Sequence, residues 1–219
     1  GWEAQLAAGW QGLAVPSAVF AGSVASERIN QRVVDCASRR WPQQALIWLR
    51  SQASCCGVRI QYAEPERFGV DRLAALVGAR ALLGARPLVV VDVGTALTVD
   101  VLEASGLHRG GWIMPGLRLM AASLGAGAAR LAQVDWGAVN ISCAPQHASG
   151  SAILAGVRCM AQGGVRQALH SATGVLGVQP EVVICGGDAV VLAEALVEYR
   201  QHSRATLVLD GLAIMAEQG

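Results

Sequence analysis

An aspartate followed by a glycine-threonine turn lies in the middle of the sequence, within Val89–Asp100. Asp92 follows an apolar run, and Gly94 and Thr95 come after it, separated from it by Val93. A carboxylate at a strand end can hold a cation, while the N–H groups of the turn and the threonine hydroxyl can face phosphate oxygens. The segment therefore predicts nucleotide chemistry. An aspartate that caps an ordinary hairpin turn explains the same residues equally well.

A second group of polar side chains, Gly69-Val70-Asp71-Arg72, stands at the start of a helical pattern. Asp71 near a helix N-terminus would be held ionised by the helix dipole, which suits a general base. Arg72 suits a substrate carboxylate, because its planar guanidinium can bind two oxygens at once. The alternatives are a plain helix cap for Asp71 and an ordinary surface arginine for Arg72.

The charge of the chain favours a small-molecule partner. The formal net charge is +1, from 17 basic and 16 acidic residues, with no long run of either sign. Nucleic acids and anionic membranes attract strongly basic surfaces, so we expect no partner of either class. Apolar stretches such as Leu88–Val91 are too short to cross a bilayer, and the first residues lack the basic start of a signal peptide. We therefore expect a cytoplasmic protein, with its six cysteines reduced.

The composition, with 53% hydrophobic and 15% charged residues, is typical of an α/β protein whose strands are buried between helices. Hydrophobic periodicity predicts helices from Ser26, over 71–83, from Pro115, over 151–169 and over 189–199, and strands over 45–49, 58–62, 88–93, 97–102, 111–113 and 181–185. Turn residues at Gly84–Pro87 separate two expected domains, 1–86 and 87–219.

Three motifs in order, Gly69–Arg72, Asp92–Thr98 and Gly110–Gly116, closely resemble the signature set of type III pantothenate kinases, and Leu209–Ala213 resembles the ending of that family. The resemblance extends from about Tyr62 to the C-terminus. It implies the actin-like α/β fold, with two ribonuclease-H-like halves and ATP in the cleft between them. The implied reaction is the ATP-dependent phosphorylation of pantothenate to 4'-phosphopantothenate, the first step of coenzyme A biosynthesis.

The same resemblance implies roles for individual residues. Asp71 matches the general base that takes the proton of the pantothenate hydroxyl, and Asp92 matches the ligand of a monovalent cation, potassium or ammonium. The implied substrate contacts are Tyr62, Gly69, Val70, Arg72 and Ser149, and the implied contacts of ATP, which would bind with Mg²⁺, are Gly94, Thr95, Gly186 and Gly187. Plainer alternatives are packing for Tyr62, an N-cap for Ser149 and an ordinary turn for the glycine pair.

One part of the family pattern is absent from the sequence. The family begins with a strand that carries an Asp-x-Gly-Asn-Ser/Thr phosphate loop followed by a lysine, whereas Gly1–Val24 contains neither aspartate nor lysine. We therefore expect an N-terminal half that lacks its first strand and phosphate loop, with negligible kinase activity in the sequence as printed. The alternatives are a non-catalytic accessory or regulatory member of the family, or another actin-like kinase of a sugar or acetate. The motif Gly69–Arg72 argues against the latter.

The resemblance also implies a homodimer with substrate held close to the subunit contact. The apolar stripe Ile153, Val157, Met160 and Gly164 of the predicted 151–169 helix is the expected contact surface.

Overall fold

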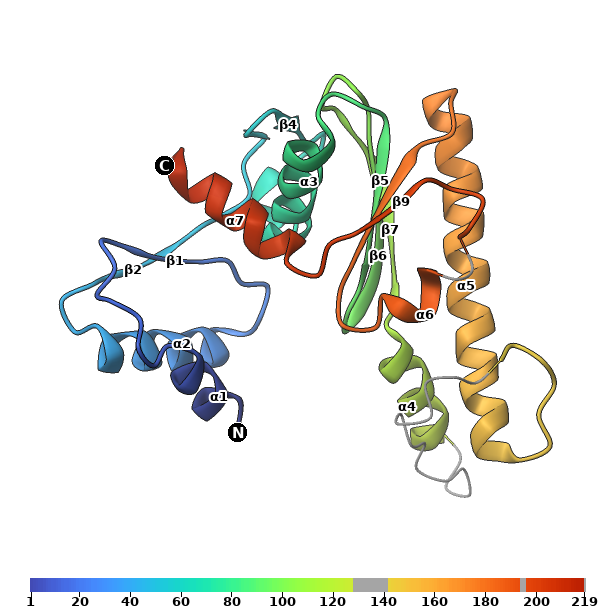
Figure 1. Cartoon of the computed structure of the whole chain (residues 1–219), viewed down its shortest axis with the longest axis horizontal. Coiled ribbons are helices and arrows are strands. Elements are labelled where there is room, and N and C mark those ends of the chain that lie inside the picture. Colours follow the sequence, from blue (N-terminus) through green and yellow to red (C-terminus); the bar gives the residue numbers. More distant parts are fainter. Residues whose placement is uncertain (128–141, 194–195, 219) are drawn as a thin grey trace.

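The computed structural model describes residues 1–127, 142–193 and 196–218, and its largest feature is a five-stranded sheet with the order β7-β6-β5-β8-β9 (Figure 1). The strands are β5 (Leu88–Val93), β6 (Ala96–Leu102), β7 (His108–Pro115), β8 (Glu181–Cys185) and β9 (Gln201–Ser203). The first three form an antiparallel meander, whereas β8 is parallel to β5 and β9 is parallel to β8. The carboxyl end of the central strand β5 therefore lies beside that of β8.

The apolar run at β5 forms a central strand because both of its faces can be buried. Val89, Val91 and Val93 pack in one core cluster, and Leu88 and Val90 pack in the other. Side chains alternate between the two faces of a strand, and β-branched valines favour extended backbone. The predicted strands over 88–93 and 97–102 are confirmed.

Helices cover both faces of this sheet (Figure 1). One face carries α5 (Ser149–Leu176), with α4 (Leu117–Gly127) and α6 (Val190–Ala193) beside it, and the other face carries α3 (Val70–Leu83) and α7 (Leu207–Glu217). Gly211 allows α3 and α7 to approach closely, because a Cβ there would overlap the carbonyl group of Ala74. The expected boundary between 1–86 and 87–219 thus separates α3 from β5, although the two contribute to one core cluster.

A smaller lobe precedes this sheet in the chain. It contains α1 (Trp2–Gly9), β1 (Val19–Ala21), α2 (Glu27–Arg40) and β2 (Leu46–Trp48), and is followed by the hairpin β3 (Ser54–Cys55) and β4 (Val58–Arg59) and the 3₁₀ helix η1 (Pro65–Arg67). Strands β1 and β2 are parallel. The lobe contacts the rest of the molecule after β1, where Gly22 lies against Leu212 of α7 and Val70 of α3.

Differences from the sequence expectations have local causes. Pro115 ends β7 and does not start a helix, because the following Gly116 N–H donates to the carbonyl oxygen of Thr95 at 3.0 Å and delays α4 to Leu117. Among the described residues, the helix expected over 189–199 is limited to α6. Residues 196–200 form a turn that leads into β9, whose short polar sequence carries no strand signal. Within the described ranges, no helix is both long and apolar enough to cross a lipid bilayer.

Candidate active site

The turn between β5 and β6 holds the first pair of residues predicted to contact ATP. The N–H of Gly94 donates to the carbonyl oxygen of Ala96 at 3.0 Å, and Thr95 is exposed at the tip. Gly116 packs against this turn at the start of α4, because a Cβ there would overlap the carbonyl oxygens of Gly94 and Thr95. Gly116 therefore holds one side of the turn, while Thr95 remains exposed on the surface.

The second predicted ATP-contacting pair, Gly186 and Gly187, follows directly after β8. Gly186 has φ +94°, a conformation that favours glycine, and Gly187 has open space where a side chain would stand. The N–H of Asp188 donates to the carbonyl oxygen of Val93 at 3.1 Å, which joins this turn to the end of β5. Both glycine turns lie at the carboxyl edge of parallel strands, where α/β sheets bind ligands.

Asp92 lies at the same edge, paired in register with Cys185 of β8. Burial raises the pKa of Asp92, and the charges of Asp71 and Asp100 raise it further, while a hydrogen bond with the Cys185 thiol opposes the rise. Burial also raises the pKa of this thiol, so Cys185 stays protonated and donates. The carboxylate of Asp92 is therefore half-buried in a site where added positive charge would be favourable.

Asp92 and a backbone oxygen border a small space at Gly186. A Cβ at Gly186 would stand 2.5 Å from Asp92 Oδ1 and 2.5 Å from the carbonyl oxygen of Val93. No cluster of three or more His, Cys, Asp or Glu side chains suited to a metal occurs in the described part of the chain. A carboxylate with a carbonyl oxygen is a donor set for a hard cation, so these residues fit the expected monovalent ion.

Asp71 lies in the first turn of α3, whose N-cap is Gly69. Its Oδ1 accepts a hydrogen bond from the backbone N–H of Arg72 at 2.8 Å. A side chain on Gly69 would stand 2.5 Å from this same oxygen, so glycine leaves room for the carboxylate. The side chain of Val70 is buried in the core, which leaves only its backbone for a substrate contact. The negative charge of Asp71 contributes to the raised pKa of Asp92.

Arg72 is engaged by a carboxylate of the protein itself. The guanidinium is 8% exposed, and its Nε and Nη2 donate to Asp100 Oδ2 and Oδ1 at 2.9 and 2.6 Å. Burial lowers the pKa of Arg72, but the hydrogen bonds and charge of Asp100 outweigh it, so the pKa is raised overall. The bidentate interaction that the sequence suggests for a substrate carboxylate is thus made with Asp100.

An aromatic cluster surrounds this ion pair. The Arg72 guanidinium lies 4.5 Å from the ring centre of Phe68, and its Nη1 donates a long 3.4 Å hydrogen bond to the hydroxyl of Tyr62. His108, which is 1% exposed, places Nε2 2.7 Å from Asp100 Oδ1. Sequence reasoning missed Asp100, His108 and Phe68. The available signal was Asp100 itself, a charged residue inside an apolar strand pattern.

Comparisons with known proteins identify the family. The sequence model of the family described as type III pantothenate kinase matches residues 3–177. A type III pantothenate kinase of Xanthomonas axonopodis pv. citri (strain 306) is 38% identical over 216 residues, which cover 99% of this chain and 85% of the relative. The chain belongs to the type III pantothenate kinase family. A relative of the same name from Stenotrophomonas maltophilia (strain R551-3) is 36% identical over 194 residues, covering 89% of this chain and 76% of the relative.

Solved structures agree with this assignment at the level of the fold. A Baf-family protein from Campylobacter jejuni superposes with a TM-score of 0.62 at 20% identity, covering 98% of this chain and 87% of that chain. Ethanolamine utilization protein EutJ from Carboxydothermus hydrogenoformans gives a TM-score of 0.50 at 13% identity, covering 97% and 70%. The predicted α/β fold of the actin-like type is confirmed.

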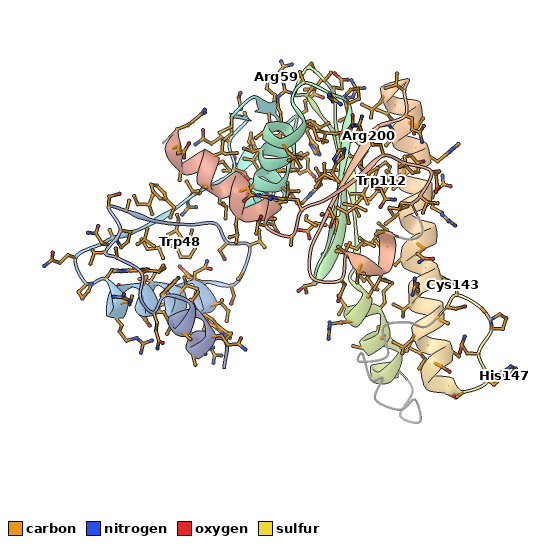
Figure 2. All side chains as sticks on the ribbon, in the orientation of Figure 1. Trp48, Arg59, Trp112, Cys143, His147 and Arg200 are labelled. Carbon is orange, nitrogen blue, oxygen red and sulfur yellow. The ribbon has the colours of Figure 1, made fainter. Side chains whose placement is uncertain are left out.

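Ser149, the remaining residue implied by the family resemblance, is not beside the others. It is exposed at the first turn of α5, and its neighbour His147 lies at this end of the helix, away from α3 (Figure 2). A groove of about 440 Å³ runs here between α4 and α5, lined by Ser149, Leu124 and Met160 among others. Within a single subunit, the structure does not bring Ser149 to Asp71.

The helix stripe expected to form a dimer contact is only partly on the surface. Ile153 and Val157 are buried in the core cluster beneath α5, whereas Met160 is 55% exposed. Gly164 packs near Met114 of β7. The expected stripe is therefore wrong for Ile153 and Val157, because these side chains cover the sheet, and the face of α5 open to a partner is centred on Met160.

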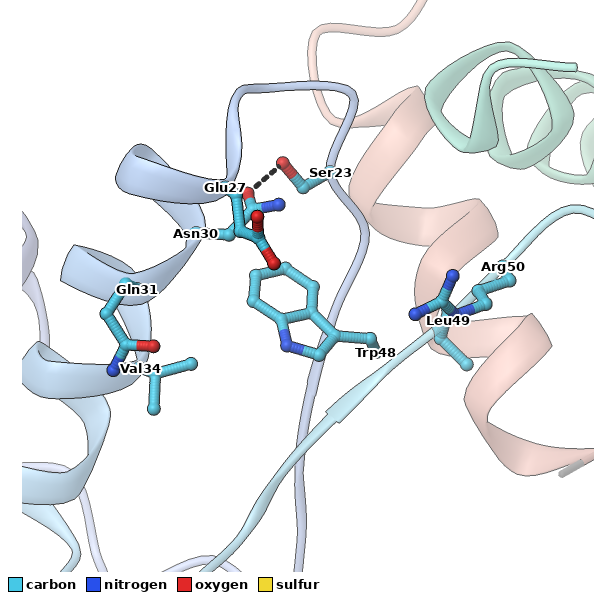
Figure 3. Close-up of a pocket in the computed structure, with 8 residues that line it drawn as sticks. All are labelled: Ser23, Glu27, Asn30, Gln31, Val34, Trp48, Leu49 and Arg50. Carbon is cyan, nitrogen blue, oxygen red and sulfur yellow. Dashed lines mark hydrogen bonds between the residues drawn. The ribbon is translucent and has the colours of Figure 1, made fainter. Parts of the chain in front are cut away.

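A polar pocket of about 280 Å³ lies apart from these residues, between α2 and the end of β2 (Figure 3). Glu27, Asn30, Trp48 and Arg50 are among its lining residues, and Ser23 donates to Asn30 at 2.5 Å. It contains none of the residues implied by the family resemblance.

Proposed function

We propose that this protein transfers the γ-phosphoryl group of ATP to pantothenate and forms 4'-phosphopantothenate, the first step of coenzyme A biosynthesis. Membership of the type III pantothenate kinase family supports the reaction. The observation that carries it in this chain is the place of Asp71 at the N-terminus of α3, next to Arg72, whose guanidinium is bound by Asp100 of β6, while Asp92 lies near the end of the neighbouring strand β5. The proposed proton acceptor, Asp71, and the proposed ATP-binding turns therefore lie in the same part of the structure.

In this mechanism Asp71 takes the proton of the pantothenate hydroxyl as its oxygen attacks the terminal phosphorus. A carboxylate can accept this proton when it lies within hydrogen-bond distance of the hydroxyl. The glycine turns at Gly94 and Gly186 hold the nucleotide against backbone, so the reacting atoms are kept in line. When bound, Mg²⁺ neutralises charge on the ATP phosphates.

Asp92 is proposed to hold a potassium or ammonium ion beside the phosphates. Burial and the charges of Asp71 and Asp100 raise the pKa of this carboxyl, and both it and the carbonyl oxygen of Val93 lie against Gly186. A cation here would keep Asp92 ionised and offset the repulsion between phosphate and carboxylates.

We further propose that the active form is a homodimer. Ser149 contacts pantothenate in the family pattern but lies apart from Asp71 in one subunit, so its contact would come from a second copy. The exposed face of α5 around Met160 offers the apolar surface for that association. Because the reaction consumes ATP of the cytoplasm, we place the protein there.

The test is a direct assay of product. The protein is expressed from its gene and purified. It is incubated with ATP, Mg²⁺, potassium and pantothenate, and mass spectrometry follows the phosphorylated product. Acetate and hexoses serve as competing acceptors. Phosphorylated pantothenate as the main product supports the proposal, and phosphorylation of a sugar or acetate in preference to pantothenate contradicts it.

A further inference from the structure

We infer that Asp100 and His108 are positioning residues for the substrate site, which hold Arg72 so that its Nη1 and the hydroxyl of Tyr62 face the substrate. This inference rests on the proposed function for the identity of the substrate. The hydrogen bonds and burial that support it are features of this chain and do not depend on which substrate binds. Asp100 and His108 are 2% and 1% exposed, so neither can itself touch a ligand in solution, whereas Tyr62 is 39% exposed.

The hydrogen-bond pattern determines which atoms remain for a substrate. Asp100 takes the Nε and Nη2 side of the guanidinium with two charged hydrogen bonds. The remaining nitrogen, Nη1, lies 3.4 Å from the hydroxyl oxygen of Tyr62. A guanidinium has no acceptor, so Nη1 donates and the Tyr62 oxygen accepts. The proton of the Tyr62 hydroxyl is then free to donate outward, and the site presents donors to an acceptor oxygen, such as those of a carboxylate or an amide.

His108 fixes the orientation of Asp100. An ionised carboxylate only accepts hydrogen bonds, so the His108 nitrogen at 2.7 Å, Nε2, must carry the proton. Oδ1 of Asp100 thus accepts from both His108 and Arg72, and, within the described residues, Oδ2 accepts from Arg72 alone. The carboxylate cannot rotate without breaking several charged bonds, and it therefore determines where the guanidinium lies.

The glycine of the β7 motif makes room for this arrangement. Gly111 is paired in register with Asp100. A Cβ on Gly111 would stand 2.6 Å from Asp100 Oδ1 and 3.1 Å from Arg72 Nη2, and would overlap the carbonyl oxygen of Val99. Gly111 therefore serves the positioning of Arg72, although it lies on β7 and Arg72 lies on α3.

A purely structural ion pair between α3 and β6 would show the same distances, so the test must separate positioning from stability. His108→Leu removes the donor to Asp100, whereas His108→Gln keeps an N–H that can reach it. Arg80→Met is the matched control, because Arg80 also joins α3 to the sheet, through the carbonyl oxygen of Ala104 at 3.0 Å, away from Tyr62. Thermal unfolding of each variant identifies those that remain folded.

Steady-state kinetics of the full-length protein provide the readout. We expect His108→Leu and Asp100→Asn to raise the KM for pantothenate about tenfold to a hundredfold, the range for losing a charged hydrogen bond, and to change the KM for ATP less than about twofold. His108→Gln should restore most of the pantothenate affinity, and Arg80→Met should change neither KM. An unchanged pantothenate KM in folded His108→Leu, or no advantage of glutamine over leucine, overturns the inference.

A second measurement stands apart from catalysis. If the wild-type protein fails to phosphorylate pantothenate, the proposed function is wrong, and the positioning claim is judged by NMR. The Arg72 Nε–H should exchange slowly with water in the wild type and faster in His108→Leu, with His108→Gln close to the wild type. Equal exchange rates in wild type and His108→Leu would show that His108 does not hold the pair.

Discussion

Replacing Asp92 by asparagine should make the fold more stable in the absence of small cations. Burial and the charges of Asp71 and Asp100 raise the pKa of Asp92 above its value of 3.8 in an unfolded chain. A raised pKa means that the folded state binds the proton more tightly. The resulting stability is present below about pH 4 and is lost as the pH rises through the folded pKa. Asparagine cannot ionise, so Asp92→Asn avoids this loss at neutral pH.

The size of the effect depends on the cation. In cation-free buffer each unit by which the pKa is raised costs the wild type about 1.4 kcal/mol at neutral pH. A potassium ion bound at Asp92 reverses the order, because a ligand at a hundred times its Kd adds about 2.7 kcal/mol. Unfolding entropy of about 2.1 cal/mol/K per residue over 219 residues converts this gain to a rise in Tm of about 6 °C.

The assay is thermal unfolding of wild type and Asp92→Asn at neutral pH, in potassium chloride or in tetramethylammonium chloride at equal ionic strength. The large organic cation cannot enter the site at Gly186, so it controls for screening. We expect potassium to raise the Tm of the wild type alone, and Asp92→Asn to have the higher Tm in tetramethylammonium. An identical potassium response in both proteins, or a less stable Asp92→Asn in tetramethylammonium, would refute the reasoning.

Two further predictions concern packing and assembly. Gly211→Ala should lower the free energy of unfolding by about 1–3 kcal/mol in urea titrations, because the new Cβ overlaps the Ala74 carbonyl of α3. Gly163→Ala on α5, with nothing within 4 Å of the added carbon, is the control and should not destabilise. Met160→Glu should shift the protein toward monomer in light scattering, because it buries a charge in the proposed interface, whereas Val175→Glu on the same helix should not. A dimer unaffected by Met160→Glu would place the interface elsewhere.

The sequence predicts the strand β5 and the turns after β5 and β8 well because their signals are local. The alternating valines of β5 and the glycine turns after β5 and β8 are each contained in a few consecutive residues. The parallel pairing of two such strands then brings their ends together. Asp71 shows the limit of this reasoning, since cap and base were equally good interpretations of the residue alone. In the structure its carboxylate accepts the N–H of Arg72, and its charge contributes to the raised pKa of Asp92.

The surroundings of Arg72 depend on contacts between distant segments and could not be predicted from the sequence. Its partner Asp100 lies on β6, and His108 reaches the same carboxylate from β7 after a turn. Which acid an arginine pairs with is decided by how α3 crosses the sheet. The dimer contact predicted on α5 is wrong for Ile153 and Val157 for a related reason. Helical spacing groups Ile153 with Met160, but the position of the sheet decides which of them is buried.

The most direct test of the central claim compares phosphoryl transfer and pantothenate binding in wild type and Asp71→Asn. Rapid-quench single-turnover assays at saturating ATP measure transfer, and calorimetry measures the pantothenate Kd. Losing the general base should slow transfer by about 10²- to 10⁴-fold, while the Kd changes less than about threefold because asparagine fills the same space. Near-wild-type transfer by Asp71→Asn would contradict the assignment of Asp71 as the base and, with it, the proposed mechanism.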